Sequence, residues 1–374
     1  MKLILKSILT CIALIITCSC SQTNVDNIKL KGKYPIPKIE FNPRHYICYK
    51  TDEKLVVDGV LDEKSWQKTT WSTNFIDIEG VKEPIHQTRV KMLWDEEYLY
   101  IGAELNEPHI NASLKQRDTI IYYDNDFEIF IDPDGDTHNY FEFEINAFNT
   151  VWDLFMVKPY RNGGPAVTGW DIANLKSAVK IFGTINNPSD FDKKWTIEIG
   201  IPLKSLNYAN KKTIIDNDIW RINFSRVQWQ YEVVDGKYQK KINPKTNRHF
   251  PEYNWVWSPQ GVINMHYPEM WGFLQFSQKI PGTETVTFSL SNDEKIKWDL
   301  RKIYYYQQIH YHNLKKYANK LEPLKKIGLS INKKESSIIF ETTKSMFKIS
   351  IPFGDKLWHI NHEGKTWKTA ILIP

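Results

Sequence analysis

The chain has 374 residues, a formal net charge of +5, four cysteines and an aromatic content of 14%. This length allows two domains and a sizeable core, and so few cysteines exclude a fold held together by disulfides. Basic residues outnumber acidic ones after Thr283, whereas the region before it is mildly acidic. No arginine-rich helix or aromatic-and-basic motif accompanies the basic tail, so we expect no nucleic-acid partner.

The first residues have the pattern of an export signal. Lys2 and Lys6 precede an apolar run that ends at Ile16, too short for a comfortable membrane span. Cysteines then follow small or polar residues, as in bacterial lipoprotein signals, so residues 1–20 are predicted to be a lipoprotein signal with Cys20 as the lipidated residue. Cys18 is the rival, and an ordinary secretory signal is the alternative. The expected location is the cell envelope, lipid-anchored at the outer membrane or cell surface.

A polar tether is predicted over residues 21–45, and strands follow it. The run LVVDGVLDEKSW, Leu55 to Trp66, combines a turn at Asp58-Gly59 with a helical turn that places an indole in the core. The run TRVKMLWDEEYLYIGAEL, Thr88 to Leu105, predicts a hairpin.

The segment FEIFIDPDGDTHNYFEFEINAFNTVWD, Phe127 to Asp153, predicts a second hairpin with one apolar face and one carboxylate-rich face. Its turn crowds Asp132, Asp134 and Asp136 together, and these offer hard oxygen ligands for calcium. A plain acidic turn is the competing interpretation, because the spacing does not match an EF-hand loop.

Short alternating runs continue to Phe276 and predict a mainly β fold, a β-sandwich with jelly-roll or immunoglobulin-like layers over residues 46–281. From Asp293 the apolar period changes to three and four residues, which predicts a helix, and strand-like runs follow. Residues 282–374 are therefore predicted to form a small α+β appendage. Its basic character suggests solvated surface that faces anionic lipid or glycan, or a docking surface for a protein partner.

Four segments together resemble the family 9 carbohydrate-binding modules and the larger group similar to them: LVVDGVLDEKSW, TRVKMLWDEEYLYIGAEL, FEIFIDPDGD and WTIEIGIP. The resemblance implies a β-sandwich, a glycan ligand and structural calcium. It places Glu128 and Asn146 in the sugar site and Tyr122 near a sandwiching tryptophan. Glu144 stands where the family has an arginine, and the second tryptophan has no secure match near His266.

Sugar binding needs flat apolar faces and planar polar groups. The candidate binding residues are Tyr122, Trp152, Tyr160 and Trp170 for the first, and Glu128, Asn146, Glu198 and Arg221 for the second. The hypothesis is non-catalytic capture of a polysaccharide or oligosaccharide, without an organic cofactor.

Three alternatives remain open. A glycoside hydrolase would use paired carboxylates, and a scaffold would dock an assembly partner through the tail. A haem protein would need axial ligands such as Met156, Met265 or His266, but the sequence has no C-x-x-C-H motif.

Overall fold

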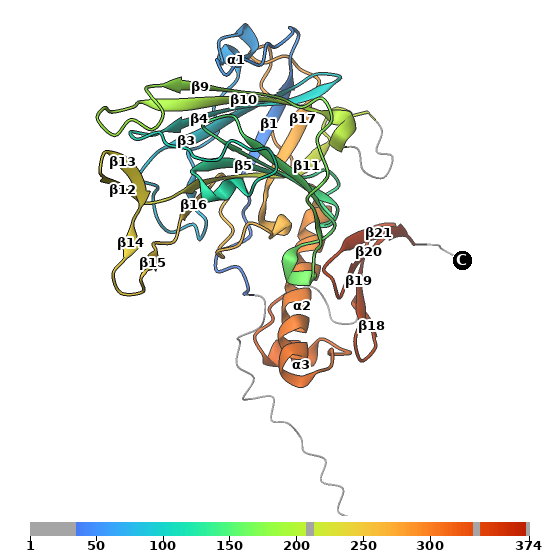
Figure 1. Ribbon diagram of the computed structural model, residues 1–374. Helices are drawn as coiled ribbons and strands as arrows, with labels where there is room; N and C mark the ends of the chain where they lie inside the picture. Colours follow the sequence, from blue (N-terminus) through green and yellow to red (C-terminus); the bar gives the residue numbers. More distant parts are fainter. Residues whose placement is uncertain (1–34, 207–212, 332–336, 372–374) are drawn as a thin grey trace, which may run out of the picture.

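A computed structural model describes residues 35–206, 213–331 and 337–371 of the chain (Figure 1). Within these ranges thirteen strands form one curled sheet, in the order β8-β7-β6-β5-β11-β17-β1-β3-β4-β10-β9, with β16 paired to β11 and β2 paired to β16. The strands are β1 (His45–Lys50), β2 (Ile76–Asp77), β3 (Thr88–Trp94), β4 (Tyr98–Asn106), β5 (Asp126–Asp132), β6 (Tyr140–Asn146), β7 (Val151–Met156), β8 (Ala166–Val167), β9 (Lys176–Phe182), β10 (Lys194–Pro202), β11 (Ile219–Gln228), β16 (Tyr253–Val256) and β17 (Gly272–Ser277).

The sheet curls into two layers that enclose the main core. β9, β10, β4 and β3 lie over β7, β6, β5 and β11, and β1 and β17 connect the layers through a parallel pair (Figure 1). Each strand alternates, so that Phe127, Ile129 and Ile131 of β5 enter the core beside Phe141, Phe143 and Ile145 of β6. The predicted mainly β sandwich is confirmed.

The sandwich also carries short helices and two small hairpins. They are α1 (Lys64–Lys68), η2 (Ile121–Tyr123), η3 (Tyr160–Asn162), η4 (Leu203–Leu206), η5 (Pro268–Met270) and two small hairpins, β12 (Tyr231–Val234) with β13 (Lys237–Lys240) and β14 (Ile242–Asn243) with β15 (Arg248–His249). None of the helices in the described ranges is long and apolar enough to cross a membrane.

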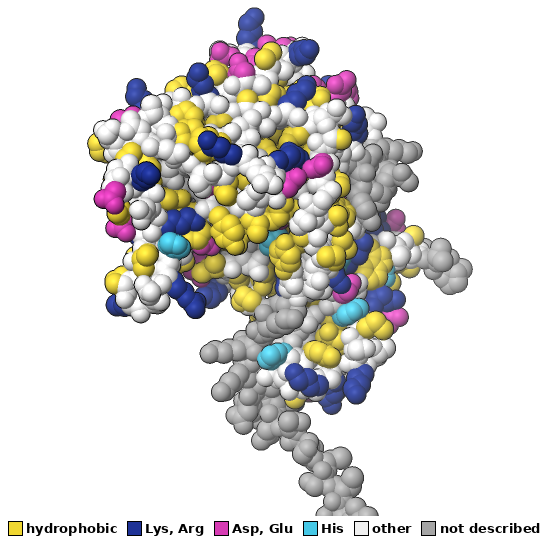
Figure 2. Space-filling view, viewed as in Figure 1, with side chains coloured by type: hydrophobic (Ala, Val, Ile, Leu, Met, Phe, Trp, Pro, Cys, Tyr) yellow, Lys and Arg dark blue, Asp and Glu magenta, His cyan; other side chains and the backbone are white. Residues whose placement is uncertain are grey.

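The C-terminal residues fold into a helix packed on a four-stranded sheet. Its elements are α2 (Asn292–Leu314), α3 (Glu322–Lys326), β18 (Ile339–Thr342), β19 (Phe347–Phe353), β20 (Lys356–Asn361) and β21 (Thr366–Ala370). Ser291 caps α2 by accepting a hydrogen bond from the Asp293 N–H at 3.1 Å. The predicted α+β appendage is therefore present, and Figure 2 shows Lys and Arg side chains gathered over its α3 end. The predicted boundary at residue 281 stays a prediction.

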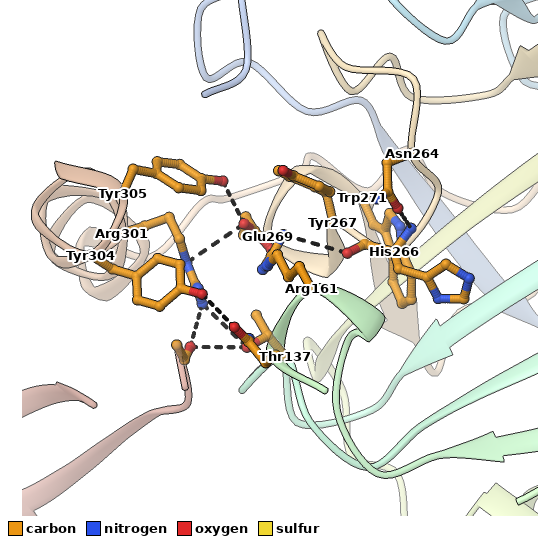
Figure 3. Close-up of polar contacts among 12 residues, drawn as sticks. Thr137, Arg161, Asn264, His266, Tyr267, Glu269, Trp271, Arg301, Tyr304 and Tyr305 are labelled. Carbon is orange, nitrogen blue, oxygen red and sulfur yellow. Dashed lines mark hydrogen bonds and ion pairs between the residues drawn. The ribbon is translucent and has the colours of Figure 1, made fainter. Parts of the chain in front are cut away.

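The appendage is joined to the sandwich through a buried ionic network (Figure 3). Glu269 of η5 accepts a hydrogen bond from Arg161 of η3, with Nη2 to Oε2 at 2.7 Å, and another from the Tyr305 hydroxyl of α2. The Arg301 guanidinium lies 3.9 Å from the same carboxylate and donates to the Gly364 carbonyl. Burial alone would raise the pKa of Glu269, but the two arginine charges lower it to about 2.

Candidate functional site

Polar side chains line the outer face of the strands from β11 to β7. In the antiparallel ladders Ser225 lies opposite Glu128, Glu128 opposite Glu144, and Glu144 opposite Trp152. Glu142, two residues before Glu144, lies on the same face of β6, because side chains two residues apart in a strand share a face. The three glutamates Glu128, Glu142 and Glu144 are named the acidic face below.

The three glutamates of the acidic face are buried, with Glu128 and Glu142 each 6% exposed and Glu144 1% exposed. Burial, with a smaller contribution from the Glu252 carboxyl, raises the pKa of Glu128 to about 7, although an interaction with the Ser225 side chain acts in the opposite direction. Burial and then the Glu128 charge raise the pKa of both Glu142 and Glu144 well above its ordinary value. Glu128 can therefore accept hydrogen bonds when ionised and donate one when protonated near neutral pH.

Aromatic rings border these glutamates. Tyr160 is 52% exposed, and its ring meets that of His266 edge to face at 4.5 Å between centroids. Glu142 and Glu144 both raise the pKa of Tyr160 after burial does, and the Tyr122 N–H donates to Glu144 at 3.0 Å. Tyr122, Trp152, Tyr160 and His266 therefore form an aromatic border around the acidic face.

His266 reaches this border from the loop before η5, and Figure 3 shows it beside Trp271. Its Nδ1 lies 2.8 Å from the Tyr140 hydroxyl, and its Nε2 lies 4.0 Å from Glu142 Oε2. Burial and the Arg161 charge lower the pKa of His266 to about 3, so the imidazole is neutral at physiological pH. A neutral ring offers an apolar surface and one N–H donor.

Asn146 lies on the same side of β6, but its carboxamide is fully used within the protein. The Nδ2 donates to the Leu114 carbonyl at 2.8 Å and to Asp124 Oδ2 at 3.0 Å. The Oδ1 accepts from the N–H groups of Phe148 and Thr150, at 3.0 Å each. This side chain closes the turn between β6 and β7, so in this structure it has no polar atom left for a ligand.

Trp170 lies on the opposite side of the sheet from Trp152. Its ring contacts those of Phe141 and Phe155, with centroids 5.0 and 6.4 Å away, and it packs against the main core. The prediction that Trp170 shares a surface with Tyr122 and Trp152 is therefore not met, because the long loop that carries it folds back onto the core face.

Glu198 is also separated from the acidic face. On β10 it accepts hydrogen bonds from Trp66 Nε1 at 2.9 Å and from the Asp58 and Gly59 N–H groups at 3.0 and 3.2 Å. Gly59 has a φ of +87°, and a Cβ there would lie 2.9 Å from the Lys180 nitrogen. Glu198 thus holds the Asp58-Gly59 turn and the Trp66 indole in place, so this pattern of turn and tryptophan is structural.

Arg221 lies on the same side as Glu128 but at the far end of the strands. Its Nη1 donates to the Trp271 carbonyl at 2.7 Å, its Nη2 pairs with Glu294 of α2 at 2.9 Å, and its guanidinium lies 3.8 Å from the Phe273 ring centroid. The appendage covers this end, so Arg221 serves the junction between the two units.

Asp132, Asp134 and Asp136 converge as predicted, with one oxygen from each within 4.8 Å of the others. Several of these oxygens already have protein partners: Asp132 accepts from the N–H groups of Gly135 and Thr137, and Asp136 lies 3.1 Å from Lys365 Nζ. The lysine supplies positive charge that a bound cation would otherwise supply. Calcium at this turn stays a prediction.

Two cysteines predicted for lipidation and two methionines considered as haem ligands complete the predicted positions. Cys20 and Cys18 lie outside the described residues. Met156 and Met265 pack with Phe130 and Trp271 in an apolar cluster beside the acidic face, where they fill space between side chains.

Period-two alternation in the sequence places Asp126, Glu142 and Glu144 on the same face as Glu128, so the pattern alone was enough to group these four carboxyls. His266 has no such signal, because only the tertiary structure brings its loop to the acidic face.

The fold and this face define a class: a β-sandwich in which aromatic rings border a set of buried carboxyls on the outer side of the sheet, the two kinds of group that sugar binding uses. Residues 57–220 match the family described as "Carbohydrate family 9 binding domain-like". The match confirms the resemblance predicted from the sequence over this part of the chain, which includes β5, β6 and β7.

Two curated relatives share shorter stretches. An exoglucanase XynX from Acetivibrio thermocellus is 28% identical over 102 residues, 26% of this chain and 8% of that protein. An endo-1,4-beta-xylanase C from Paenibacillus barcinonensis is 29% identical over 120 residues, 31% of this chain and 10% of that protein. The chain thus matches a tenth or less of the length of either relative.

Two solved structures are similar in outline. A Bacteroides uniformis protein described as a candidate carbohydrate-binding protein has a TM-score of 0.45 at 14% identity, over 63% of this chain and 100% of that one. A family 9 carbohydrate-binding module from Caldicellulosiruptor kristjanssonii, in complex with cellotriose, has a TM-score of 0.39 at 16% identity, over 65% and 100%. Scores this low define no residue correspondence.

Proposed function

We propose that this protein captures a polysaccharide or oligosaccharide, without cleaving it, on the acidic face and its aromatic border. The observation that supports this most directly is the convergence of Tyr122, Trp152 and Tyr160 around buried carboxyls, within the region that matches a carbohydrate-binding family. Half-exposed rings can stack on the C–H face of a pyranose, while carboxyls bind its hydroxyls. The ligand is therefore a glycan.

Lipid anchoring and export complete the proposal. The lipoprotein-like pattern around Cys20 supports attachment of the protein to a membrane by an N-terminal lipid, which would hold the sandwich at the cell envelope or surface. The basic residues near α3 support a contact with anionic lipid, glycan or a protein partner.

A glycan array probed with the purified full chain in detergent tests capture. We expect binding to at least one glycan, and Tyr160→Ala and Glu128→Gln should each weaken retention about tenfold, since loss of a stacked ring or a charge-assisted hydrogen bond costs about 1.5 kcal/mol. Phe191→Ala is the matched control, because Phe191 is an aromatic residue that is 81% exposed on another loop. Equal retention by wild type, Tyr160→Ala and Glu128→Gln would rule out this site.

The same experiment separates the alternatives. Glu128, with its pKa raised to about 7, has the protonation behaviour of a general acid, so product analysis belongs in the assay. Oligosaccharide released from a bound glycan would favour a glycoside hydrolase. Absence of binding to every glycan, with an intact fold, would favour the assembly scaffold.

A further inference from the structure

A cleft lies beside the β12–β13 hairpin, on the side of the sandwich away from the sheet of the appendage (Figure 1). Its volume is about 300 Å³, the size of a small ligand pocket, and an adjoining hollow of about 570 Å³ continues it. Side chains that line the cleft include Asn111, Gln228, Tyr231, Tyr238 and Tyr253. We infer that the cleft is a second glycan-binding site, which takes an uncharged sugar. The inference rests on the proposed glycan capture but uses no residue of the acidic face or its aromatic border.

The floor of the cleft is organised by Arg226, which is 1% exposed. Its guanidinium donates to Glu107 Oε2 at 2.7 Å and to Gln228 Oε1 at 2.7 and 3.0 Å. It also donates to the Thr88 hydroxyl at 3.1 Å and to the Asn106 carbonyl at 3.0 Å. The arginine charge is therefore balanced by Glu107 within the protein, so the floor suits an uncharged ligand better than an ion.

Two buried carboxamides in the cleft are each only half used. Gln228 is 5% exposed; Arg226 has only donors and so holds its Oε1, whereas its Nε2 has no hydrogen-bond partner in the described ranges. Asn111 is 6% exposed; its Nδ2 donates to the His109 carbonyl at 3.0 Å, and its Oδ1 has no partner among the described residues. Buried polar groups are normally paired, so this oriented donor and acceptor are available to the hydroxyls of a ligand.

Tyrosine rings form the walls of the cleft. Tyr231 of β12 and Tyr238 of β13 meet edge to face, with ring centroids 6.3 Å apart, and the Tyr238 hydroxyl lies 3.0 Å from His109 Nδ1. Tyr253 is 40% exposed and stacks on Trp255, with centroids 5.7 Å apart. Rings of this kind can stack on the C–H face of a pyranose while amides bind its hydroxyls.

Trp229 connects the cleft with the aromatic border. It lines the cleft, and its Nε1 donates to the Tyr122 carbonyl at 2.8 Å. Lys240 Nζ lies 3.5 Å from the centroid of the Trp229 ring. Because Trp229 contacts both places, variants that separate the two sites must lie on either side of it, as Tyr160 and Tyr231 do.

Photolabelling locates bound sugar directly. The probes are neutral trisaccharides of glucose, xylose, mannose or galactose, each with an alkyl diazirine at its reducing end. They are irradiated with the purified full chain in detergent, and labelled peptides are mapped by mass spectrometry. In wild type we expect label in residues 228–241 as well as in the strands of the acidic face. Excess unlabelled neutral sugar should remove the label from residues 228–241, whereas trigalacturonic acid should not.

Variants assign each label to its site. Tyr231→Ala and Gln228→Met should each reduce labelling of residues 228–241 about tenfold, because a stacked ring or a hydrogen bond is lost, and leave the acidic face labelled. Tyr160→Ala should have the reverse effect. Phe182→Ala, at an aromatic residue of β9 that is 36% exposed, and Gln307→Met, at a buried carboxamide of α2, are the matched controls and should label as wild type does.

Melting temperatures of all variants verify that each is folded. The inference is overturned if residues 228–241 carry no label, if Tyr231→Ala and Gln228→Met label normally, if the controls lose as much label, or if trigalacturonic acid competes as well as neutral sugar. Label confined to the acidic face would thus remove the cleft and leave the proposed site standing. Label confined to residues 228–241 would support the cleft and rule out the acidic face.

Discussion

Glu128 of β5 and Glu144 of β6 lie directly opposite each other in an antiparallel ladder, both nearly fully buried. Like charges at such positions destabilise a sheet, and here neither residue has a cationic partner in the described ranges. Unfavourable arrangements of this kind occur most often at functional sites.

Removing one of the two charges should stabilise the protein in the absence of metal. Glu144→Gln keeps an oxygen for the Tyr122 N–H and removes the repulsion, so the free energy of unfolding at pH 8 in EDTA should rise by about 1 kcal/mol. Glu104→Gln is the matched control: that carboxylate pairs with Arg89 and Lys194, so its loss should destabilise. Urea unfolding measures both, and a destabilised Glu144→Gln would contradict the prediction.

The stability of the metal-free protein should depend on pH through Glu128. Its folded pKa of about 7 lies above the ordinary value of 4.5, so its stabilising contribution is complete below pH 4.5 and is lost as the pH rises through 7. Relative to Glu128→Gln, wild type should lose up to about 3 kcal/mol between pH 5 and pH 8.

The difference in stability between wild type and Glu128→Gln cancels the contribution of every titrating group that both proteins share. His266 is one such group: its pKa is lowered to about 3, so its contribution to stability has the opposite sign. Melting temperatures measured in EDTA across this range provide the comparison. A difference that does not change with pH would show that Glu128 does not titrate in this window.

Loss of Glu198 should unfold the segment that contains the Asp58-Gly59 turn. Glu198→Ala leaves two backbone N–H groups and the Trp66 indole without their acceptor, and we expect a loss of about 3 kcal/mol. Glu97→Ala, at an exposed position, should change stability by less than about 0.5 kcal/mol. The measurement is chemical unfolding followed by tryptophan fluorescence, and similar values for the two variants would refute a structural role for Glu198. Glycan retention at equal folded concentration should be unchanged.

Two acidic residues at the junction between sandwich and appendage should differ strongly in how much their ion pairs stabilise the protein. Glu269 pairs with Arg161 inside the sandwich and lies 3.9 Å from Arg301 of α2, whereas Glu363 of the appendage pairs with Lys158 of the sandwich. Glu269→Gln leaves the buried Arg161 without its counter-charge and should cost about 4 kcal/mol. Glu363→Gln breaks the pair with Lys158, in which the side chains are 37% and 21% exposed, and should cost about 1 kcal/mol or less. Limited trypsin digestion would report the loosened appendage as faster cleavage between β17 and α2. Equal digestion of both variants would contradict this ranking.

The proposed lipid attachment should depend on one cysteine. Cys20→Ala should move the protein from the detergent phase to the aqueous phase in detergent partitioning, whereas Cys18→Ala should leave it in the detergent phase. Mass spectrometry of the mature N-terminus identifies the modified residue. The reverse result would assign the lipid to Cys18. If neither variant enters the detergent phase, a simple secretory signal is favoured.

Local sequence patterns determined much of the acidic face. Alternation in the β5 and β6 segments was sufficient to separate Phe127, Ile129 and Ile131 from the carboxylates, because a strand places successive side chains on opposite faces regardless of its neighbours. The helix after Asp293 was equally predictable from its three- and four-residue period. The mainly β class follows from these periods alone.

Only the tertiary structure decided which aromatic and polar residues meet. Trp152 sits on a strand and joins the acidic face, whereas Trp170 sits in an aperiodic loop and packs on the core. Glu198 has the alternation expected of a site residue, yet its partners are Trp66 and a turn more than a hundred residues earlier in the chain. His266 reaches the face through the loop before η5, a contact between distant segments. Strand periodicity specifies faces, but contacts between loops far apart in sequence depend on how the whole chain packs, and these contacts turn an acidic hairpin into a candidate binding site.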